Sequence, residues 1–401
     1  MNHQTLIQSS YPQALSRIIA ICGDISLAED CLQDAVEKAL NHWPTNCPDN
    51  PLAWLISVAR NQFIDVCRRQ QKSVDWATLD EPSIEPDLSE QALLQSYNDD
   101  VLRLIFTCSH PALNLETQIA LTLKHVLGLN VEQIANALLV SSKSMEQRLT
   151  RARKKIQLAK IEYQIPSPQQ WQPRLKGVLK TIYLLFNEGY LSTSGVKFLE
   201  LDLCNEAIRL GRLLHSCIKD DAEVLGLLAL MLHQHARAAA RVSSNGQVIL
   251  SADQDRSLYK AGAIAEANVL VEKALRRGRG SPYAIQAAIA ALYNNAKDEA
   301  STDWPQIAGL YRVLMQLDGN PVIRLNAAVV TAKVAGYPQA IEQMLALQGP
   351  LNDYRHFHSG LAGLYFESGQ MALAKGSYLK ALTLTTSDSE VAFLQGRLAL
   401  C

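Results

Sequence analysis

The side chains best suited to chemistry lie between residues 141 and 160, in the stretch SSKSMEQRLTRARKKIQLAK. From Lys143 to Lys160 this stretch holds seven basic residues and one acid, whereas the whole chain carries a net charge of −1. Arg can bind a guanine edge through two hydrogen bonds, Gln can do the same with adenine, and Lys neutralises phosphates. The composition therefore favours a DNA-binding segment over a merely solvated basic helix end.

Two helices joined by a short turn would position these side chains. In GLNVEQIANALLV, Asn130 with Gln133 predicts a capped first helix, and a turn at 140–142 leads into a second one. In the second helix an apolar stripe at helical spacing leaves the polar residues together on the opposite side, which is the pattern of a helix-turn-helix. The candidate DNA-contacting residues are Lys143, Ser144, Gln147, Arg148, Arg151 and Lys155.

A second group of polar residues lies on predicted helices in the first 72 residues. In GDISLAEDCLQDAVEKAL the apolar positions recur at helical spacing, and Ser26 with Glu29 predicts a capping box. The next helix begins at Asn50 and Pro51, an N-cap residue followed by a first-turn proline. The first of these helices has an acidic face with Glu29, Asp30, Gln33, Asp34 and Glu37. The second has a mixed polar face with Asn61, Asp65, Arg68 and Lys72 at helical spacing, and Arg69 follows Arg68 in the chain.

Composition divides the chain into segments of different character. Residues 1–72 and 103–160 are predicted to be helical, and residues 73–102 between them hold eight acids and no Lys or Arg, which predicts an acidic linker. Residues 165–401 are rich in Ala and Leu and contain 23 bases and 20 acids, so this segment is close to neutral.

The last part of this neutral segment matches a tetratricopeptide unit. In HFHSGLAGLYFESGQMALAKGSYLKALTLTT, Gly369 lies in the turn between two predicted helices. The packing positions of the unit are Leu361, Ala362, Tyr365, Ala374, Tyr378 and Ala381. The expected fold class is therefore all-α, with a tetratricopeptide-like helical array at the end of the chain.

Several function classes find no support in the residues. The eight cysteines are scattered without a CxxC pair, so neither a metal site nor a disulfide framework is expected. No nucleophile–base pair and no phosphate-binding glycine loop is found, so we expect no enzyme activity and no cofactor. The chain has no run of 18 apolar residues and no signal-peptide pattern, which predicts a cytoplasmic protein without membrane contact.

The order of these features resembles a bacterial RNA polymerase sigma factor of the extracytoplasmic-function (ECF) type, which keeps only promoter-binding regions two and four. The resemblance covers residues 1–160 and consists of the acidic-faced helix, PLAWLISVARNQFIDVCRRQ, the acidic linker and the helix-turn-helix that ends in RLTRARKKI. The phrases LLFNEGY, DQDRSLY, TDWPQIAGLY and LNDYRHFH resemble the subgroup with a tetratricopeptide-like C-terminal extension. The resemblance implies a sigma factor that directs promoter-specific transcription initiation.

The resemblance also implies a role for each segment. Region two (1–72) would bind the β′ clamp helices of core polymerase through Glu29, Asp30, Gln33 and Asp34 of its acidic face. It would also hold the melted −10 element with Asn61, a base pocket at 43–51 and the polar residues up to Lys72. Region four (103–160) would contact the β flap and read the −35 element with the helix-turn-helix. The linker would imitate nucleic acid in the RNA path.

The extension (165–401) is expected to regulate this activity, and a regulatory protein that binds the array is one expected partner. The alternative is a stand-alone transcriptional regulator with a helix-turn-helix and a tetratricopeptide sensor. Residues 25–72 separate these two interpretations, because a regulator that only binds DNA would not need them.

Overall fold

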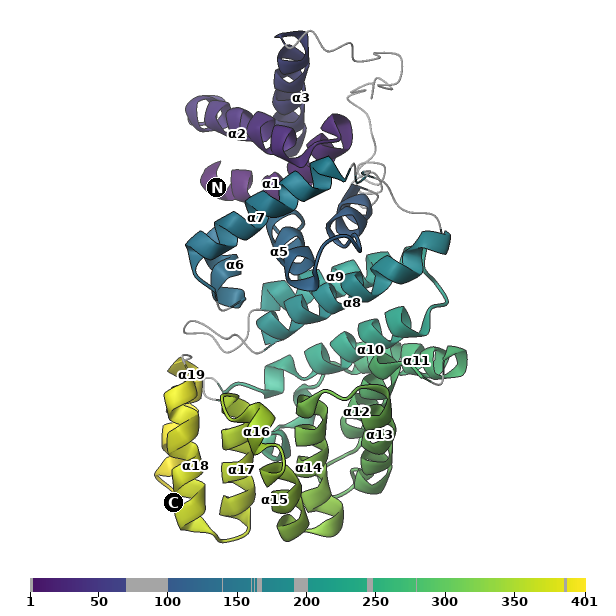
Figure 1. The fold of residues 1–401 in the computed structure, drawn as a ribbon, viewed down its shortest axis with the longest axis vertical. Helices are drawn as coiled ribbons and strands as arrows, with labels where there is room; N and C mark the ends of the chain where they lie inside the picture. The colour runs from purple at the N-terminus through teal and green to yellow at the C-terminus, as the bar shows by residue number, and fades with distance from the viewer. Residues whose placement is uncertain are drawn as a thin grey trace. The chain divides into compact units, whose positions relative to one another are not determined.

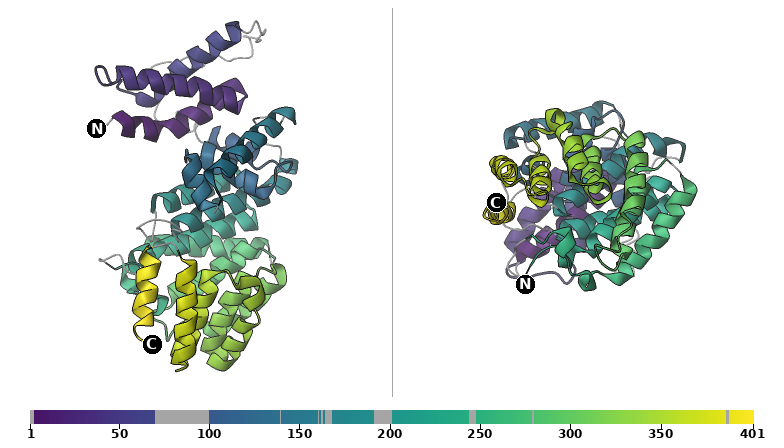
Figure 2. Two further views of the ribbon diagram at one scale, coloured as in Figure 1. Left: turned by 60° about the vertical axis from the view of Figure 1, so that its left-hand side comes forward. Right: turned by 90° about the horizontal axis from the view of Figure 1, so that it is seen from below.

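The computed structural model is built from helices throughout (Figures 1 and 2). It describes residues 3–69, 100–138, 140–159, 161, 163, 168–190, 201–243, 248–278, 280–385 and 388–401. Among these residues the only extended pairing is one isolated antiparallel bridge, between Val242 and Val248. The predicted all-α class is therefore confirmed. The chain forms two compact units, 1–181 and 182–401, and the boundary falls inside α8 (Pro168–Tyr190).

The first unit begins with three helices that pack against one another, drawn in purple in Figure 1. Ile18, Leu32 and Leu55, one from each helix, are fully buried between them. Asn50 accepts a hydrogen bond from the Ala53 N–H at 3.0 Å, so the predicted cap of the third helix is present. The helices are α1 (His3–Cys22), α2 (Ile25–His42) and α3 (Pro51–Arg69).

The start of α2 differs from the predicted capping box. Asp24 is the N-cap, and its Oδ1 accepts hydrogen bonds from the backbone N–H groups of Ser26 and Leu27 at 2.8 and 3.1 Å. A carboxylate at this position satisfies two donors that the helix leaves unpaired and interacts favourably with the helix dipole. Because Asp24 takes this role, the side chain of Glu29 is free to make contacts outside its own helix.

The second part of this unit contains the predicted helix-turn-helix. Asn130 Oδ1 accepts from the Gln133 N–H and Gln133 Oε1 accepts from the Asn130 N–H, at 2.8 and 2.9 Å, so this capping box is formed. Ser141 caps the second helix. The buried stripe of that helix is the predicted one, namely Met145, Leu149, Ala152 and Ile156. The helices are α5 (Leu115–His125), α6 (Val131–Ala137) and α7 (Ser142–Leu158), preceded by a helix over 100–108.

Most of the predicted acidic linker, and Lys72 with it, lies outside the described residues. Its last residues, 100–102, are not linker in the structure but are buried in a helix. Asp100 is held there by two cations, with Oδ2 at 3.3 Å from Arg17 Nη1 and Oδ1 at 3.4 Å from Arg103 Nη1. The charge of Asp100 therefore joins α1 to this helix. A count of acidic residues along the sequence could not distinguish this charge from those of the linker.

The second unit is a succession of helices that pack mostly on helices one or two places away in the chain, drawn from teal through green to yellow in Figure 2. Helices α10 and α12 approach closely at Gly226 of α10, where an added Cβ would lie 2.4 Å from the Ala284 nitrogen in α12. The helices after α8 are α9 (Leu201–Cys217), α10 (Ala222–Ala236), α11 (Ala261–Arg277), α12 (Pro282–Asn295), α13 (Trp304–Leu317), α14 (Pro321–Ala335), α15 (Tyr337–Leu345), α16 (Gln348–Leu351), α17 (Arg355–Glu367), α18 (Met371–Leu384) and α19 (Asp388–Leu398).

The pair α17 and α18 coincides with the predicted tetratricopeptide unit. All six predicted packing positions are buried. Gly369, between the two helices, has φ +78°, a conformation that favours glycine. The local prediction of burial is confirmed, whereas assignment of the whole extension to the tetratricopeptide class stays a prediction.

The structure gives one phrase of the extension a structural role inside the second unit and does not support a C-cap role in another. Arg256 in DQDRSLY donates to the carbonyl oxygens of Tyr293 and Ala296, at 2.8 and 2.7 Å. Hydrogen bonds from a charged donor are stronger than those between neutral groups, so these two hold the segment at the C-terminal end of α12. In LLFNEGY, Gly189 would suit a helix C-cap, but α8 continues through Tyr190 and Gly189 does not have a positive φ.

Candidate nucleic-acid interface

The outward side of α7 gathers the residues that sequence analysis assigned to DNA contact. Because Met145, Leu149, Ala152 and Ile156 face the core, the residues between them must face away from it. Five of the six candidates are exposed, and within the described part of the chain their side chains form no ion pair or hydrogen bond. These five are Lys143, Ser144, Gln147, Arg151 and Lys155.

Arg148 is the exception on this face. Its Nη1 lies 2.9 Å from Glu116 Oε2 at the start of α5, and its side chain is 25% exposed against 70% for Glu116. The pair is a solvent-accessible ion pair, of the kind that contributes little to stability. In the unbound chain Arg148 is therefore held by an acid of the same domain, and it must leave that acid before it can contact another anion or a base.

The polar residues of α3 form a second exposed surface. Asn61, Asp65, Arg68 and Arg69 are all exposed, and Arg68 Nη1 lies 3.9 Å from Asp65 Oδ1. The loop that precedes α3 is exposed apart from the half-buried Pro48 and the buried Trp43. The ring of Trp43 packs edge-on against Trp54, with the ring centroids 5.6 Å apart. Trp54 is thus part of a packing contact.

The four residues of the predicted polymerase-binding face on α2 do not share one environment. Asp30 and Gln33 are exposed, and Asp34 accepts a hydrogen bond from Gln62 Nε2 of α3 at 2.7 Å. Glu29 instead points toward α5 and α7, and its side chain is only 15% exposed. The structure therefore keeps three of these residues on the outward side and separates Glu29 from them.

Glu29 is surrounded by basic side chains from the helix-turn-helix domain. Its Oε2 lies 3.2 Å from Arg153 Nη2, and its Oε1 lies 3.7 Å from Lys124 Nζ and 3.4 Å from His125 Nδ1. Burial, and then the two cations, lower the pKa of His125 to about 3, so this ring is neutral at pH 7. Burial raises the pKa of Glu29, while Arg153 and Lys124 oppose that effect.

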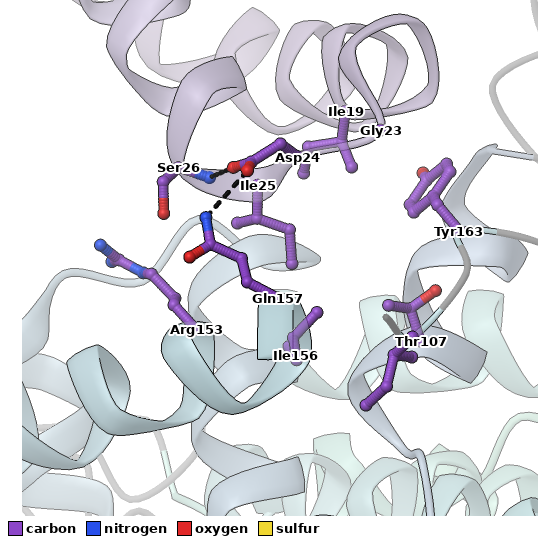
Figure 3. A pocket seen from close by; sticks show the side chains of 11 residues that line it. Ile19, Gly23, Asp24, Ile25, Ser26, Thr107, Arg153, Ile156, Gln157 and Tyr163 are labelled. Atoms are coloured by element: carbon purple, nitrogen blue, oxygen red, sulfur yellow. Dashed lines mark hydrogen bonds between the residues drawn. The ribbon is translucent and has the colours of Figure 1, made fainter. Parts of the chain in front are cut away.

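A second contact lies at the N-terminal end of α2. Gln157 Nε2 of α7 donates to Asp24 Oδ2 at 2.8 Å, while the other oxygen of Asp24 caps α2 (Figure 3). A cavity of about 340 Å³ lies beside this bond. Figure 3 shows Ile156 and Arg153 on one side of it and Ile25 on the other. The tyrosine at its edge, Tyr163, has its hydroxyl 2.7 Å from the Asp100 carbonyl oxygen and 3.2 Å from that of Ser16.

Sequence reasoning did not identify these contacts. It treats Arg153 only as one of seven bases in a charged stretch, and it gives no distinct role to Gln157, Lys124 or Tyr163. No local signal could have found them, because each partner lies on a different element far along the chain.

The described residues offer neither a metal site nor a membrane span. In these ranges no group of three or more His, Cys, Asp or Glu residues could hold a metal ion. No helix among the described residues is long and apolar enough to cross a membrane.

Comparison with known families defines the class of the protein. Residues 6–73 match Sigma-70 region 2, residues 103–156 match Sigma-70 region 4, and residues 174–275 match a family of unknown function, DUF6596. The chain is thus a sigma-70 protein of the ECF-like kind, a DNA-binding factor of transcription initiation with a helix-turn-helix. This confirms the resemblance in residues 1–160, and with it core RNA polymerase and promoter DNA as the partners of this class.

Two relatives place the chain more narrowly. It belongs to the same family as an uncharacterized protein of Rhizobium meliloti (strain 1021), R00370, to which it is 41% identical over 395 residues, 97% of this chain and 93% of that protein. It is 27% identical over 139 residues to the ECF RNA polymerase sigma factor SigM of Bacillus subtilis (strain 168), which covers 35% of this chain and 83% of that protein.

Proposed function

We propose that this protein is a dissociable polymerase subunit that recognises −35 and −10 promoter elements through separate surfaces and is regulated by its own C-terminal helices. The observation that carries the proposal is the presence, in one chain, of two separate exposed sets of DNA-suited side chains, on α3 and on α7, within the matches to regions 2 and 4. A regulator that only binds duplex DNA would need α7 alone.

Each surface receives a specific role. On α7, Gln147, Arg148 and Arg151 read base edges of the −35 element, while Lys143, Ser144 and Lys155 contact the backbone. On α3, Asn61 can offer both a donor and an acceptor to a base flipped from the −10 strand. Asp65, Arg68, Arg69 and Lys72 then line the path of that opened strand.

Binding to core polymerase is assigned to the exposed acids of α2. Asp30, Gln33 and Asp34, with Glu29 when it is accessible, face the clamp helices of β′. The helix-turn-helix domain contacts the β flap. Support for this assignment comes from the exposure of Asp30 and Gln33 in a helix whose opposite side is buried.

The extension is proposed to regulate the two promoter-binding parts, because a near-neutral helical array has no global charge to attract DNA. A regulatory protein is its proposed partner, since stacked helical repeats commonly bind proteins.

The decisive experiment is run-off transcription by core polymerase on a promoter library with randomised −35 and −10 elements. We expect transcripts only when the chain is present, with an enriched −35 sequence that changes in Arg151→Ala and is unchanged in Lys154→Gln, a matched change of an exposed base on the same helix. If the chain binds duplex DNA but neither binds core polymerase nor supports initiation, the stand-alone regulator is the correct interpretation.

A further inference from the structure

The compact unit that contains the helix-turn-helix continues beyond residue 156, where the match to Sigma-70 region 4 ends. This unit extends to residue 181, so it includes the first half of α8. Three apolar residues of this half, Leu175, Val178 and Leu179, are at most 4% exposed. The start of the extension is therefore packed into the unit that carries the DNA-suited residues of α7.

At Gly177, α8 lies directly against the first turns of α5. A Cβ at this position would lie 2.2 Å from Gln118 Oε1 and 3.6 Å from Ser109 Cβ, so the approach requires a residue without a side chain. The Gln118 amide is not free to move aside, because it is buried and its Nε2 donates to two carbonyl oxygens. These belong to His110 and Leu113, at 3.2 and 2.9 Å.

A second contact lies one turn earlier in α8. Arg174 Nη1 donates to the Phe106 carbonyl oxygen at 3.5 Å, in the last turn of the helix over 100–108, where carbonyl groups have no partner within the helix. Burial, and then Arg174, lower the pKa of His110. Its Nδ1 accepts a hydrogen bond from the Ala112 N–H at 3.1 Å, as a neutral ring can. The first half of α8 thus covers the turn that leads into α5.

The first turn of α5 also carries a residue that meets the DNA-suited face. Glu116, two positions before Gln118, pairs with Arg148 of α7 at 2.9 Å. Asn114 caps α5 by accepting a hydrogen bond from the Thr117 N–H at 2.9 Å, and α5 packs on α7. Since α8 holds this turn from the side away from α7, its position affects how α5 supports α7.

The second half of α8 belongs to the second unit and is anchored there. The Tyr190 hydroxyl donates to Gln234 Oε1 at 2.6 Å, and Arg241 Nη1 donates to the Tyr190 carbonyl oxygen at 2.7 Å. One helix therefore has its first half in the unit of the helix-turn-helix and its second half in the helical array.

We propose that the first half of α8 docks on α5 as a working part of the −35-reading domain, and that Gly177 is a positioning residue through which the extension acts on −35 recognition. This inference rests on the proposed function, since it assigns the regulatory role of the extension to one contact. When α8 is docked, the first turns of α5 are held and α7 is preorganised for DNA. When the contact is disturbed, α7 must be ordered as DNA binds, and binding weakens.

The test compares Gly177→Ala with Gly376→Ala in the full chain. Both substitutions add one methyl group inside a helix, but a Cβ at Gly376 of α18 would meet no atom within 4 Å. Hydrogen exchange is measured at the backbone amides of residues 115–122. We expect exchange there to be at least about fivefold faster in Gly177→Ala, because an overpacked contact favours local opening, and native in Gly376→Ala. Exchange in α10 to α14 should be native in both variants.

Binding to a −35 duplex, by the chain bound to core polymerase, supplies the second readout. Gly177→Ala should bind the −35 sequence enriched in run-off transcription about three- to tenfold more weakly, and a scrambled duplex as the native chain does. Gln118→Ala removes the oxygen that the new methyl group would meet. In that background Gly177→Ala should therefore cause no further loss.

Native exchange at 115–122 in Gly177→Ala would overturn the proposal, as would native −35 binding or an undiminished loss in the Gln118→Ala background. An equal loss on the scrambled duplex would also overturn it, because that result indicates a general defect of the domain. If no −35 sequence is enriched with the native chain, the proposed function fails, but the exchange comparison still decides whether α8 docks on α5.

Discussion

Neutralising an acid outside the DNA-binding face should strengthen recognition of the −35 element. Glu116 pairs with Arg148 at 2.9 Å in the unbound chain. If Arg148 reads a base, it must first leave Glu116, and the free energy of that pair is subtracted from the free energy of binding. Glu116→Gln removes the pair without removing the side chain that contacts DNA, so this variant should bind the −35 element more tightly.

The structure sets the size of this effect. Glu116 is 70% exposed, and exposed ion pairs contribute about 0–1 kcal/mol, so Glu116→Gln should tighten binding by at most about fivefold. Arg148→Ala should weaken binding, because a base contact contributes roughly 1–3 kcal/mol. The net loss is smaller by the free energy of the Arg148–Glu116 pair, since this pair no longer has to break when DNA binds. In the double variant the gain should vanish, because Glu116 acts only through Arg148.

Fluorescence anisotropy of the chain bound to core polymerase, at one fixed salt concentration, measures these differences. The two DNA probes carry either the selected −35 sequence or a scrambled one. Glu132→Gln is the matched control, since Glu132 is an exposed acid at the start of α6 without an ion pair among the described residues. Equal tightening on both probes, or the same gain from Glu132→Gln, would refute the reasoning, because either result indicates a general loss of negative charge.

Three further outcomes are expected. Asp30→Lys on the exposed side of α2 should weaken binding to core polymerase by about tenfold in a pull-down titration, with Glu342→Lys, at an exposed acid of α15, as the control; equal losses would indicate a general effect of charge reversal and not a docking surface on α2. Gly226→Ala should lower the free energy of unfolding by about 1–3 kcal/mol in urea titrations, because the new methyl group would overlap the Ala284 backbone; native stability would mean that α10 and α12 can move apart. Burial lowers the pKa of His233 to about 4, below its ordinary value, so the unfolded chain binds a proton that the folded chain does not, and stability should fall by about 3 kcal/mol as the pH drops from about 6.5 to 4. His233→Gln should lack this part of the pH dependence, and an unchanged profile would show that another group causes it.

The features that the sequence determined are those whose causes lie within a few residues. The reciprocal bonds of Asn130 and Gln133 join positions three apart, and the buried stripe of α7 follows from helical periodicity alone. For the same reason the sequence alone predicted which side of α7 is exposed, whereas DNA contact by its residues stays a prediction. The local burial pattern of α17 and α18 was predictable because their packing repeats at short, regular spacing.

Only the tertiary structure decided which polar residues meet. Amphipathicity places Glu29 and Asp30 together on the polar side of α2, but adjacent helical positions point about 100° apart. Whether either one is covered depends on an element that packs there from about a hundred residues further along the chain. Asp100 is a second example. From the sequence it belongs to the acidic linker, and only the structure shows that it pairs with Arg17 of α1. The order of polar and apolar residues in the sequence indicates the faces of each helix. Whether a face is covered depends on packing between elements far apart in the chain. For that reason the contact between α2 and α7 could not be predicted from the sequence.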